Sequence, residues 1–221
     1  MLRLSGCDNK IYNTDVEYEV IGSDTIVLYN GERFTGTLYE NFRKGGIKYE
    51  TLFIDGKKDG ISKRYYAYPY LKEIVTYSKG RKNGLAQKYY RNRRYEVSTY
   101  YKNDTLDGTF ESYYSSGSPD IKAIYINGIK NGPYEVYHEN GQLMEESTFV
   151  NDKRNGDFKT YFDNGQIKIK TTVVDDLFHG EYEEYYENGQ LKEKSKYKYD
   201  IVDGEKEEFD ENGKKIDYNT K

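Results

Sequence analysis

A glycine recurs every 24 residues along most of this 221-residue chain, with no insertion or deletion between copies. A fixed period of this size is the signature of a repeat architecture, in which each unit packs mainly against its neighbours. Because the spacing persists where the intervening residues diverge, every unit must have the same backbone length. Positions within a repeat are counted here from this glycine, which is position 0. The glycines are Gly36, Gly60, Gly84, Gly108, Gly132, Gly156, Gly180 and Gly204.

The composition indicates a folded chain with an unusual core. Apolar residues make up only 35% of the chain and charged residues 33%, which by itself is typical of disorder. Twenty-seven tyrosines and nine phenylalanines argue against disorder, because each aromatic side chain can bury a large area. We therefore expect rows of aromatic side chains in place of a globular interior.

Each repeat is predicted to be a β-hairpin. The last full unit reads GEYEEYYENGQLKEKSKYKYDIVD, with Asn188-Gly189 at positions 8 and 9. Asn-Gly between alternating segments predicts a two-residue type I′ turn, since both residues tolerate a positive φ. Tyr, Phe, Val, Ile and Thr on both sides favour strands. A second connection, rich in Gly, Asn, Asp and Lys, occupies positions 18 to 23. The other Asn-Gly pairs are Asn140-Gly141, Asn164-Gly165 and Asn212-Gly213.

A two-residue turn at these positions also predicts the strand pairing, because paired positions must then sum to 17. Position 2 faces position 15, as in Tyr182 with Ser195, and position 6 faces position 11, as in Tyr186 with Leu191. Since strand side chains alternate between two faces, positions 2, 6, 11, 15 and 17 should share a core face. The predicted fold class is all-β: tandem 24-residue β-hairpin repeats that form an elongated, twisted, antiparallel single-layer sheet.

A row of tyrosines at position 5 is predicted to lie on the opposite, charged face. The expected partner at position 12 is often lysine, which gives the pairs Tyr65–Lys72, Tyr161–Lys168 and Tyr185–Lys192. Two interpretations stay open: cross-strand packing with lysine stems over the rings, or an aromatic stripe that binds a ligand. The candidate binding residues are Tyr65, Tyr89, Tyr113, Tyr137, Tyr161 and Tyr185, and Phe209 takes this place in the last unit.

The repeats divide the chain into four predicted segments. Residues 1–10 hold a lipobox-like motif and a tether, and residues 11–35 form an aberrant capping hairpin. Residues 36–203 are seven repeats, and residues 204–221 are a partial repeat and C-terminal cap, as repeat arrays require at their ends. Three turns without Asn-Gly are predicted to be distorted: Tyr68-Pro69, Asn92-Arg93 and Ser116-Gly117-Ser118-Pro119.

The only cysteine lies in a motif that bears on localisation. Leu4-Ser5-Gly6-Cys7 resembles the lipobox at which bacterial lipoprotein precursors are cleaved, so Cys7 is a candidate lipidation site and membrane anchor. The three residues before this motif, Met1 to Arg3, are too few for a signal peptide. The expectation is therefore an envelope lipoprotein if the true start lies upstream, and a cytoplasmic protein otherwise.

The recurring pattern G-x-Y/F-x-x-Y-Y/F-x-N-G-Q-L/I-K resembles the MORN repeat variant family of bacterial proteins. It stands in residues 132–144, 156–168 and 180–192, and the resemblance extends from about Gly36 to Lys215. It implies tandem β-hairpins in an elongated, twisted antiparallel sheet. Members are often antitoxins or immunity proteins of toxin–antitoxin systems, and others are secreted or lipid-anchored. The resemblance carries over no catalytic residue.

No pattern of residues indicates an enzyme. His138 and His179 belong to different repeats and form no cluster with metal-ligand spacing, so no metal or cofactor is expected. The net charge of −4 gives no reason to expect nucleic-acid binding. We therefore expect a non-enzymatic scaffold that binds another protein, in its most concrete version a toxin. The alternative is a lipid-anchored envelope protein that binds glycan or a host ligand through the tyrosine row.

The average charge hides an asymmetry along the chain. From Arg43 to Asp107 there are 16 Lys and Arg against 7 Asp and Glu, whereas from Gly132 to Lys221 there are 13 against 22. The two stretches therefore carry about +9 and −9. Either these are solvated strand surfaces, or the opposite charges steer a partner or a second copy of the chain.

Overall fold

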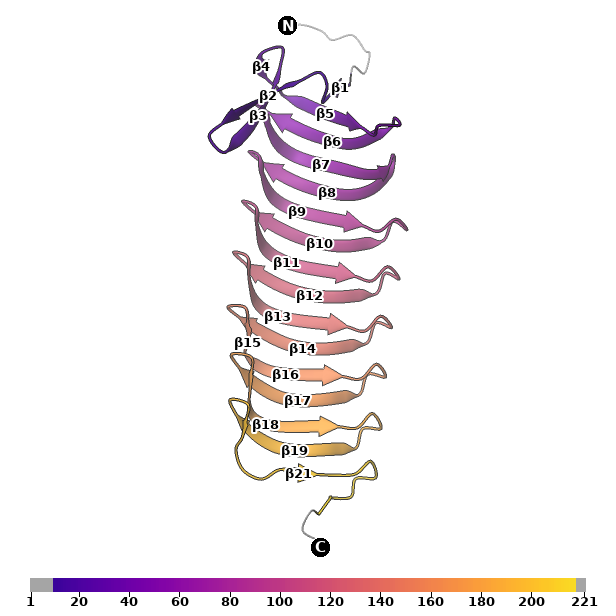
Figure 1. Cartoon of the computed structure of the whole chain (residues 1–221), viewed down its shortest axis with the longest axis vertical. Coiled ribbons are helices and arrows are strands. Elements are labelled where there is room, and N and C mark those ends of the chain that lie inside the picture. The colour runs from indigo at the N-terminus through magenta and orange to yellow at the C-terminus, as the bar shows by residue number, and fades with distance from the viewer. Residues whose placement is uncertain (1–9, 218–221) are drawn as a thin grey trace. The chain divides into compact units, whose positions relative to one another are not determined.

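A computed structural model describes residues 10–217, so Cys7 and its motif lie outside the described residues. Within this range the chain forms β-strands and turns but no helix, and hence no helix that could cross a membrane. The predicted fold class, antiparallel β-hairpins repeated about every 24 residues, is confirmed (Figure 1). The chain divides into two compact units, residues 1–105 and residues 106–221.

The N-terminal unit contains an antiparallel series of strands, β5 to β10, and a separate three-stranded sheet, β2 to β4. The short strand β1 runs parallel to β5, with Ile11 opposite Leu38. This unit contains β1 (Ile11–Tyr12), β2 (Glu17–Ile21), β3 (Asp24–Tyr29), β4 (Glu32–Arg33), β5 (Gly36–Asn41), β6 (Ile47–Ile54), β7 (Lys57–Ala67), β8 (Tyr70–Ser78), β9 (Arg81–Tyr89) and β10 (Tyr95–Lys102).

The three-stranded sheet is held to the first repeat by backbone and core contacts. Val27 and Phe34 are buried in one cluster with Leu38 and Phe53. The Val27 N–H donates to the Gly56 carbonyl oxygen at 2.9 Å. A Cβ at Gly56 would lie 2.4 Å from the Ile26 side chain, so the close approach requires glycine there. The small sheet therefore covers the start of the repeat series within this unit.

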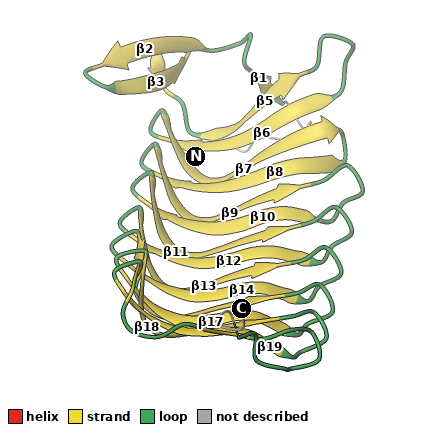
Figure 2. Ribbon diagram, turned by 60° about the horizontal axis from the view of Figure 1, so that its bottom comes forward, coloured by secondary structure: helices red, strands yellow, loops and turns green. Residues whose placement is uncertain are grey.

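The C-terminal unit continues the same hairpin pattern from Leu106, one residue into β11. Its strands pair with their neighbours in chain order, and Figure 2 shows that they are bent, so that the sheet has an inner and an outer face. The strands are β11 (Thr105–Tyr113), β12 (Pro119–Ile126), β13 (Ile129–Tyr137), β14 (Leu143–Val150), β15 (Lys153–Arg154), β16 (Gly156–Tyr161), β17 (Ile167–Val174), β18 (Leu177–Tyr185), β19 (Leu191–Lys198), β20 (Ile201–Val202) and β21 (Glu207–Glu208).

The repeated glycine has a φ angle that other residues rarely adopt. All eight position-0 glycines have φ between +97° and +151°. The pairing shifts around them: Phe149 faces Arg154, whereas Glu146 faces Lys159, so the strand containing Gly156 has extra residues there. Such a bulge bends a strand, and a glycine is the residue that accepts the required backbone. The 24-residue glycine period is therefore the period of this bend.

The type I′ turn lies at the second connection of each repeat and not at Asn-Gly, where it was predicted. Positions 19 and 20 both have positive φ, as in Asn151 at +51° and Asp152 at +65°, which is the type I′ pattern. In the Asn-Gly connection only the glycine has positive φ; Gly189 is at +84°. There the Gly189 N–H donates to Tyr186 O and the Tyr186 N–H to Gln190 O, so the loop is a type I turn with a glycine bulge.

The predicted strand pairing is therefore correct near the position-0 glycine and wrong near the Asn-Gly turn. Tyr182 faces Ser195, as expected, but Tyr185 faces Leu191, and Lys192 is an extra residue in the strand. The predicted pairing of Tyr186 with Leu191 is wrong, because the three-residue loop shortens the hairpin by one residue. Position 11 consequently shares the face of position 5 rather than the core face.

Two of the three turns predicted to be distorted are regular. The Tyr90 N–H donates to Arg94 O and the Tyr114 N–H to Ser118 O, the same bonds that close the Asn-Gly turns. Only Tyr68-Pro69 differs, with a cis peptide bond and a pairing of Ala67 with Tyr70. The bulge position thus accepts Arg93 at a φ of +69°.

Hydrogen bonds join successive repeats of the C-terminal unit at both hairpin ends. At the Asn-Gly end, Asn164 Nδ2 donates to Glu187 O at 3.1 Å, 23 residues ahead. At the other end, the Arg154 N–H donates to Asp176 Oδ1, and the Asp176 N–H donates to Arg154 O, both at 3.0 Å. Asn140 and Asn188 repeat the first contact, and the pairs Lys130–Asp152 and Phe178–Asp200 repeat the second.

Two glycine substitutions test the origin of the period. A Cβ at Gly132 would lie 3.2 Å from Ile124 Cβ, whereas a Cβ at Gly156 would meet nothing within 4 Å. Gly156→Ala should lower the free energy of unfolding by about 1–2 kcal/mol, because the alanine must adopt an unfavourable backbone φ. Gly132→Ala should lower it by about 2–4 kcal/mol, because crowding against Ile124 adds to the backbone strain. Denaturant titration measures both, and equal losses below about 0.5 kcal/mol would contradict this account.

Candidate functional site

The tyrosine row lies on the outer face of the repeats. In the C-terminal unit the hydroxyls at position 5 donate to carboxylates on that face: Tyr185 to Glu183 at 2.9 Å and Tyr161 to Glu146 at 3.0 Å. Each ring is half-buried and stands beside the aliphatic residue that pairs with it, as Ile167 does with Tyr161. Tyr113 and Tyr137 make the same contact, with Glu111 and Glu135.

The two N-terminal members of the row are less available for contact. Tyr65 is only 6% exposed, its hydroxyl donates to Glu50 at 2.8 Å, and its ring lies 5.2 Å from the Tyr68 ring. Tyr89 stacks on Tyr95 at 5.1 Å. The exposed part of the row therefore lies in the C-terminal unit.

The predicted pairs between the tyrosines and the lysines at position 12 are wrong. Lys168 stands over Phe162, at 5.7 Å from the ring centroid, rather than over Tyr161. Lys192 and Lys72 stand in the same way over Tyr186 and Tyr66. The physical reason is the extra residue near the turn, which turns the side chain at position 12 toward position 6. The lysines at position 12 therefore do not cover the tyrosine row, whereas Lys122, at position 14, stands 5.1 Å from the Tyr137 ring centroid.

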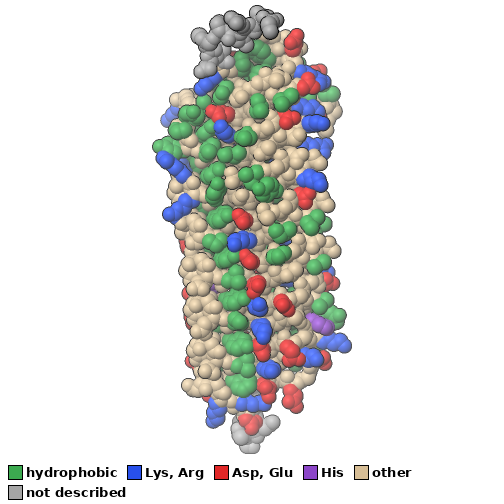
Figure 3. Space-filling model, turned by 180° about the vertical axis from the view of Figure 1, so that it is seen from behind, with side chains coloured by type: hydrophobic (Ala, Val, Ile, Leu, Met, Phe, Trp, Pro, Cys, Tyr) green, Lys and Arg blue, Asp and Glu red, His purple; other side chains and the backbone are tan. Residues whose placement is uncertain are grey.

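Opposite charges alternate beside the row. Paired residues of neighbouring repeats bring Lys170 within 3.4 Å of Glu183, and Lys159 within 3.2 Å of Glu146. Figure 3 shows a column of hydrophobic side chains beside such alternating charges in the part of the view that holds the C-terminal unit. Between these pairs lies a groove of about 390 Å³ with Thr171 and Thr172 in its wall. The outer face thus combines aromatic, aliphatic and charged side chains in a repeating order.

Burial and carboxylate contacts keep the row protonated. Burial raises the pKa of Tyr161 to about 12, and the hydrogen bond to Glu146 adds to this shift. Burial and the bond to Glu183 likewise raise the pKa of Tyr185 to about 12. The same bonds lower the pKa of Glu146 and Glu183. At neutral pH Tyr161 and Tyr185 are therefore neutral phenols, each bonded to an ionised carboxylate.

The inner face of the C-terminal unit is a packed core. Ser195 is 3% exposed, and the rings of Tyr182 and Tyr197 meet above it at 5.1 Å. Tyr134 and Phe149 repeat this contact at 4.9 Å over the buried Ser147. A small residue at position 15 lets the aromatic residues at positions 2 and 17 approach each other. The inner face buries these rings and leaves the outer row to face solvent.

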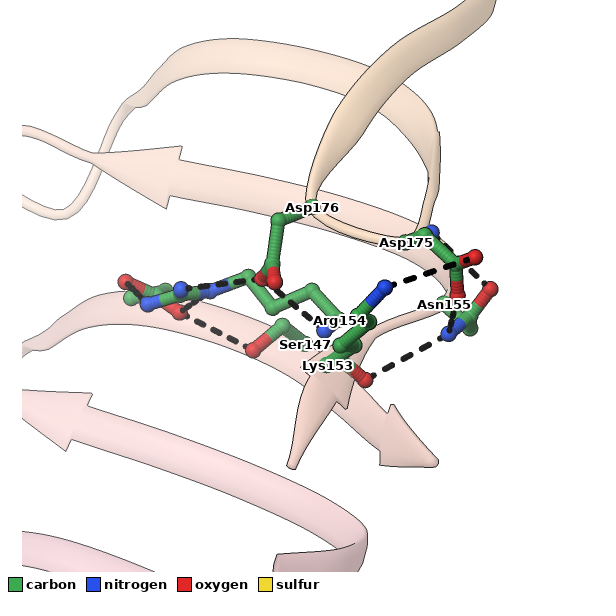
Figure 4. Close-up of polar contacts among 7 residues, drawn as sticks. Ser147, Lys153, Arg154, Asn155, Asp175 and Asp176 are labelled. Atoms are coloured by element: carbon green, nitrogen blue, oxygen red, sulfur yellow. Dashed lines mark hydrogen bonds and ion pairs between the residues drawn. The ribbon is translucent and has the colours of Figure 1, made fainter. Parts of the chain in front are cut away.

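Arg154, at position 22, covers these rings and is neutralised by a carboxylate. Arg154 Nε donates to Glu145 at 2.7 Å and its Nη2 at 3.1 Å, and the guanidinium stands 5.0 Å from the Phe149 ring centroid. Figure 4 shows Arg154 with its second acidic neighbour, Asp176, at 3.6 Å. Ser147 also donates to Glu145, at 2.9 Å. The hydrogen bonds to Glu145 raise the pKa of Arg154. This half-buried charge thus has a bidentate partner.

The histidines have structural contacts. His138 Nε2 lies 3.2 Å from the backbone oxygen of Tyr161 in the next repeat. In a later repeat, the hydroxyl of Tyr186 makes the equivalent contact with the backbone oxygen of Phe209. The His179 ring packs on Tyr199 at 4.7 Å. Among the described residues, no group of three side chains from His, Cys, Asp and Glu is placed to hold a metal ion.

A comparison with protein families identifies the repeats of the C-terminal unit. The model described as MORN repeat variant matches residues 106–127, 130–151, 154–175 and 178–199. The predicted resemblance is thereby confirmed over four tandem repeats. A search of curated proteins found no match. Repeats of this kind suggest a binding scaffold.

The protonated row predicts a particular loss of stability at high pH. A phenol whose folded pKa lies above its ordinary value of about 10 stabilises the fold below pH 10, and this contribution is lost as the pH rises toward 12. We expect the free energy of unfolding to fall between pH 10 and 12 more steeply for the native chain than for a variant with Tyr161→Phe and Tyr185→Phe. Urea titrations at several pH values measure the difference. If the free energy of unfolding has the same pH dependence in both proteins, the pKa of the two hydroxyls is not raised in the folded state.

Proposed function

Between residues 106 and 199 the chain consists of MORN repeat variants, and from this premise we propose that the C-terminal unit is a protein-binding scaffold. Its contact surface is the outer tyrosine row. The observation that carries this proposal is the regular placement of Tyr137, Tyr161 and Tyr185 in the same half-exposed geometry, each beside an aliphatic partner. Tyrosine is enriched in protein interfaces because it offers a large rigid contact at low entropic cost.

The chemistry of the surface favours a protein over a nucleic acid or a glycan. Lys–Glu pairs of alternating sign flank the row, whereas a nucleic-acid surface is predominantly basic. The hydroxyl hydrogens of Tyr161 and Tyr185 are already donated to carboxylates, which leaves the apolar sides of these rings for contact. A glycan would call for free polar groups. The lipid-anchored, glycan-binding alternative therefore receives less support from this geometry.

A basic toxin is the most concrete partner. The stretch from Gly132 to Lys221 carries 22 acidic against 13 basic residues, and an acidic surface speeds association with a basic protein. Toxin neutralisation is the role that the family resemblance implies. It would act by occupying the toxin's own functional surface, with no turnover by this chain.

Site-specific photocrosslinking tests which face makes contact. A photoreactive phenylalanine analogue replaces Tyr161 in one sample and Met144 in another; Met144 is 39% exposed and lies outside the row. Each full-length protein is irradiated in lysate of its native organism. We expect one protein to crosslink from position 161 and not from position 144. Identical crosslinks from both positions, or none from either, would contradict the proposal.

With that partner purified, substitutions in the row should weaken binding without unfolding the chain. Tyr137→Ser with Tyr161→Ser should reduce the affinity at least tenfold, about 1.4 kcal/mol, by calorimetric titration. The matched control is Met144→Ser with Val150→Ser, two exposed apolar residues outside the row, and it should change the affinity less than about twofold. Unchanged affinity with lowered stability in the row variant would assign the tyrosines to packing alone.

A further inference from the structure

The N-terminal unit contains a cavity of about 420 Å³ between β2 and the inner face of the first repeats. Its walls are mainly aromatic and polar. Tyr18 contributes from β2, Tyr49 and Phe53 from β6, and Tyr77 from β8. A volume of this size lies within the range of sites for small ligands or for one or two side chains of a peptide, about 300–1,000 Å³.

Lys58 enters this cavity from β7 without an acidic partner. Its ammonium stands 5.0 Å from the Tyr77 ring centroid, and no ion pair joins it to a carboxylate among residues 10–217. Burial lowers its pKa, and the nearby charge of Lys82 adds to that effect. Arg154, at the same repeat position in the C-terminal unit, has Glu145 as a bidentate partner, whereas Lys130, also at this position, stands 4.3 Å from the Phe149 ring centroid. A half-buried cation without a counter-ion is costly, so this position favours an incoming anion.

The remaining charges of the wall leave one positive charge in excess. Lys48 is paired with Glu40 at 2.6 Å. Arg64 stands 5.3 Å from the Tyr49 ring centroid and faces Glu73 across β7 and β8. With Lys58, the lining therefore holds three cations and two carboxylates, a net charge of +1. One added carboxylate would balance it, whereas a phosphate monoester brings about −1.5 to −2.

We infer that this cavity binds a single carboxylate next to an aromatic or aliphatic group, as presented by an acidic segment of a partner protein. Lys58 binds the carboxylate, and Tyr49, Phe53 and Tyr77 contact the apolar neighbour. This cavity is separate from the outer tyrosine row. An experiment can therefore contradict the inference about the cavity while the function proposed for the row holds, or contradict the function of the row while the inference holds.

Short peptides test the inference on the full chain. The probe is N-acetyl-Phe-Glu-amide, and the matched control is N-acetyl-Phe-Gln-amide, which differs only in the charge. Titrations followed by NMR should show saturable shifts at Tyr49 and Tyr77 with the Glu peptide, and at least tenfold weaker binding of the Gln peptide. Equal binding of both peptides, or no binding of either, overturns the inference. Tighter binding of inorganic phosphate than of the Glu peptide overturns the choice of a carboxylate.

A variant and a titration assign the contact to Lys58. Lys58→Gln should weaken the binding of the Glu peptide at least tenfold. Lys63 pairs with Glu50 on the outer face, so Lys63→Gln should leave the affinity for the peptide unchanged. In the native chain, bound peptide should raise the pKa of the Lys58 ammonium, because a nearby carboxylate favours the charged form. An unchanged pKa, or equal effects of the two substitutions, contradicts the assignment.

Discussion

Hydrogen bonds between successive repeats are the constraint on which the rest of the structure depends. A one-layer sheet has no second layer to fix the spacing of its hairpins. In the C-terminal unit, Asn164 bonds to the next Asn-Gly turn and Asp176 bonds back to Arg154 at the opposite end of the hairpin. Both contacts require a fixed number of residues between repeats. The period of 24 residues is therefore set by contacts at both edges and by the glycine bend between them.

A fixed period also explains why one surface recurs. Tyr137, Tyr161 and Tyr185 each lie beside a carboxylate and an aliphatic neighbour, so contacts with a partner can add along the C-terminal unit. The N-terminal unit departs from the arrangement at Arg154, because Lys58 has no carboxylate in the place that Glu145 takes. That departure is what leaves a cavity with an excess positive charge.

The sequence predicted the fold class and most of the strand positions, because the glycine period and the alternation of aromatic residues are strong local signals. It misplaced the type I′ turn, since Asn-Gly is compatible with both that turn and a type I turn with a glycine bulge, and only the geometry at Gly189 distinguishes them. That error moved Leu191 to the wrong face. The inter-repeat bonds of Asn164 and Asp176 and the cavity at Lys58 depend on residues 22 or more apart, which no single-repeat pattern reveals.

The direct test of the central claim is to lengthen the repeat series in two ways and compare stabilities. One chain duplicates residues 156–179, a full period of 24, and the other duplicates residues 157–179, one residue fewer. Urea titration followed by circular dichroism should give the first chain a cooperative transition at least as stable as that of the native protein. The second should lose several kcal/mol, because the contacts at both edges fall out of register. Equal stability of the two chains would contradict the claim that these contacts set the period.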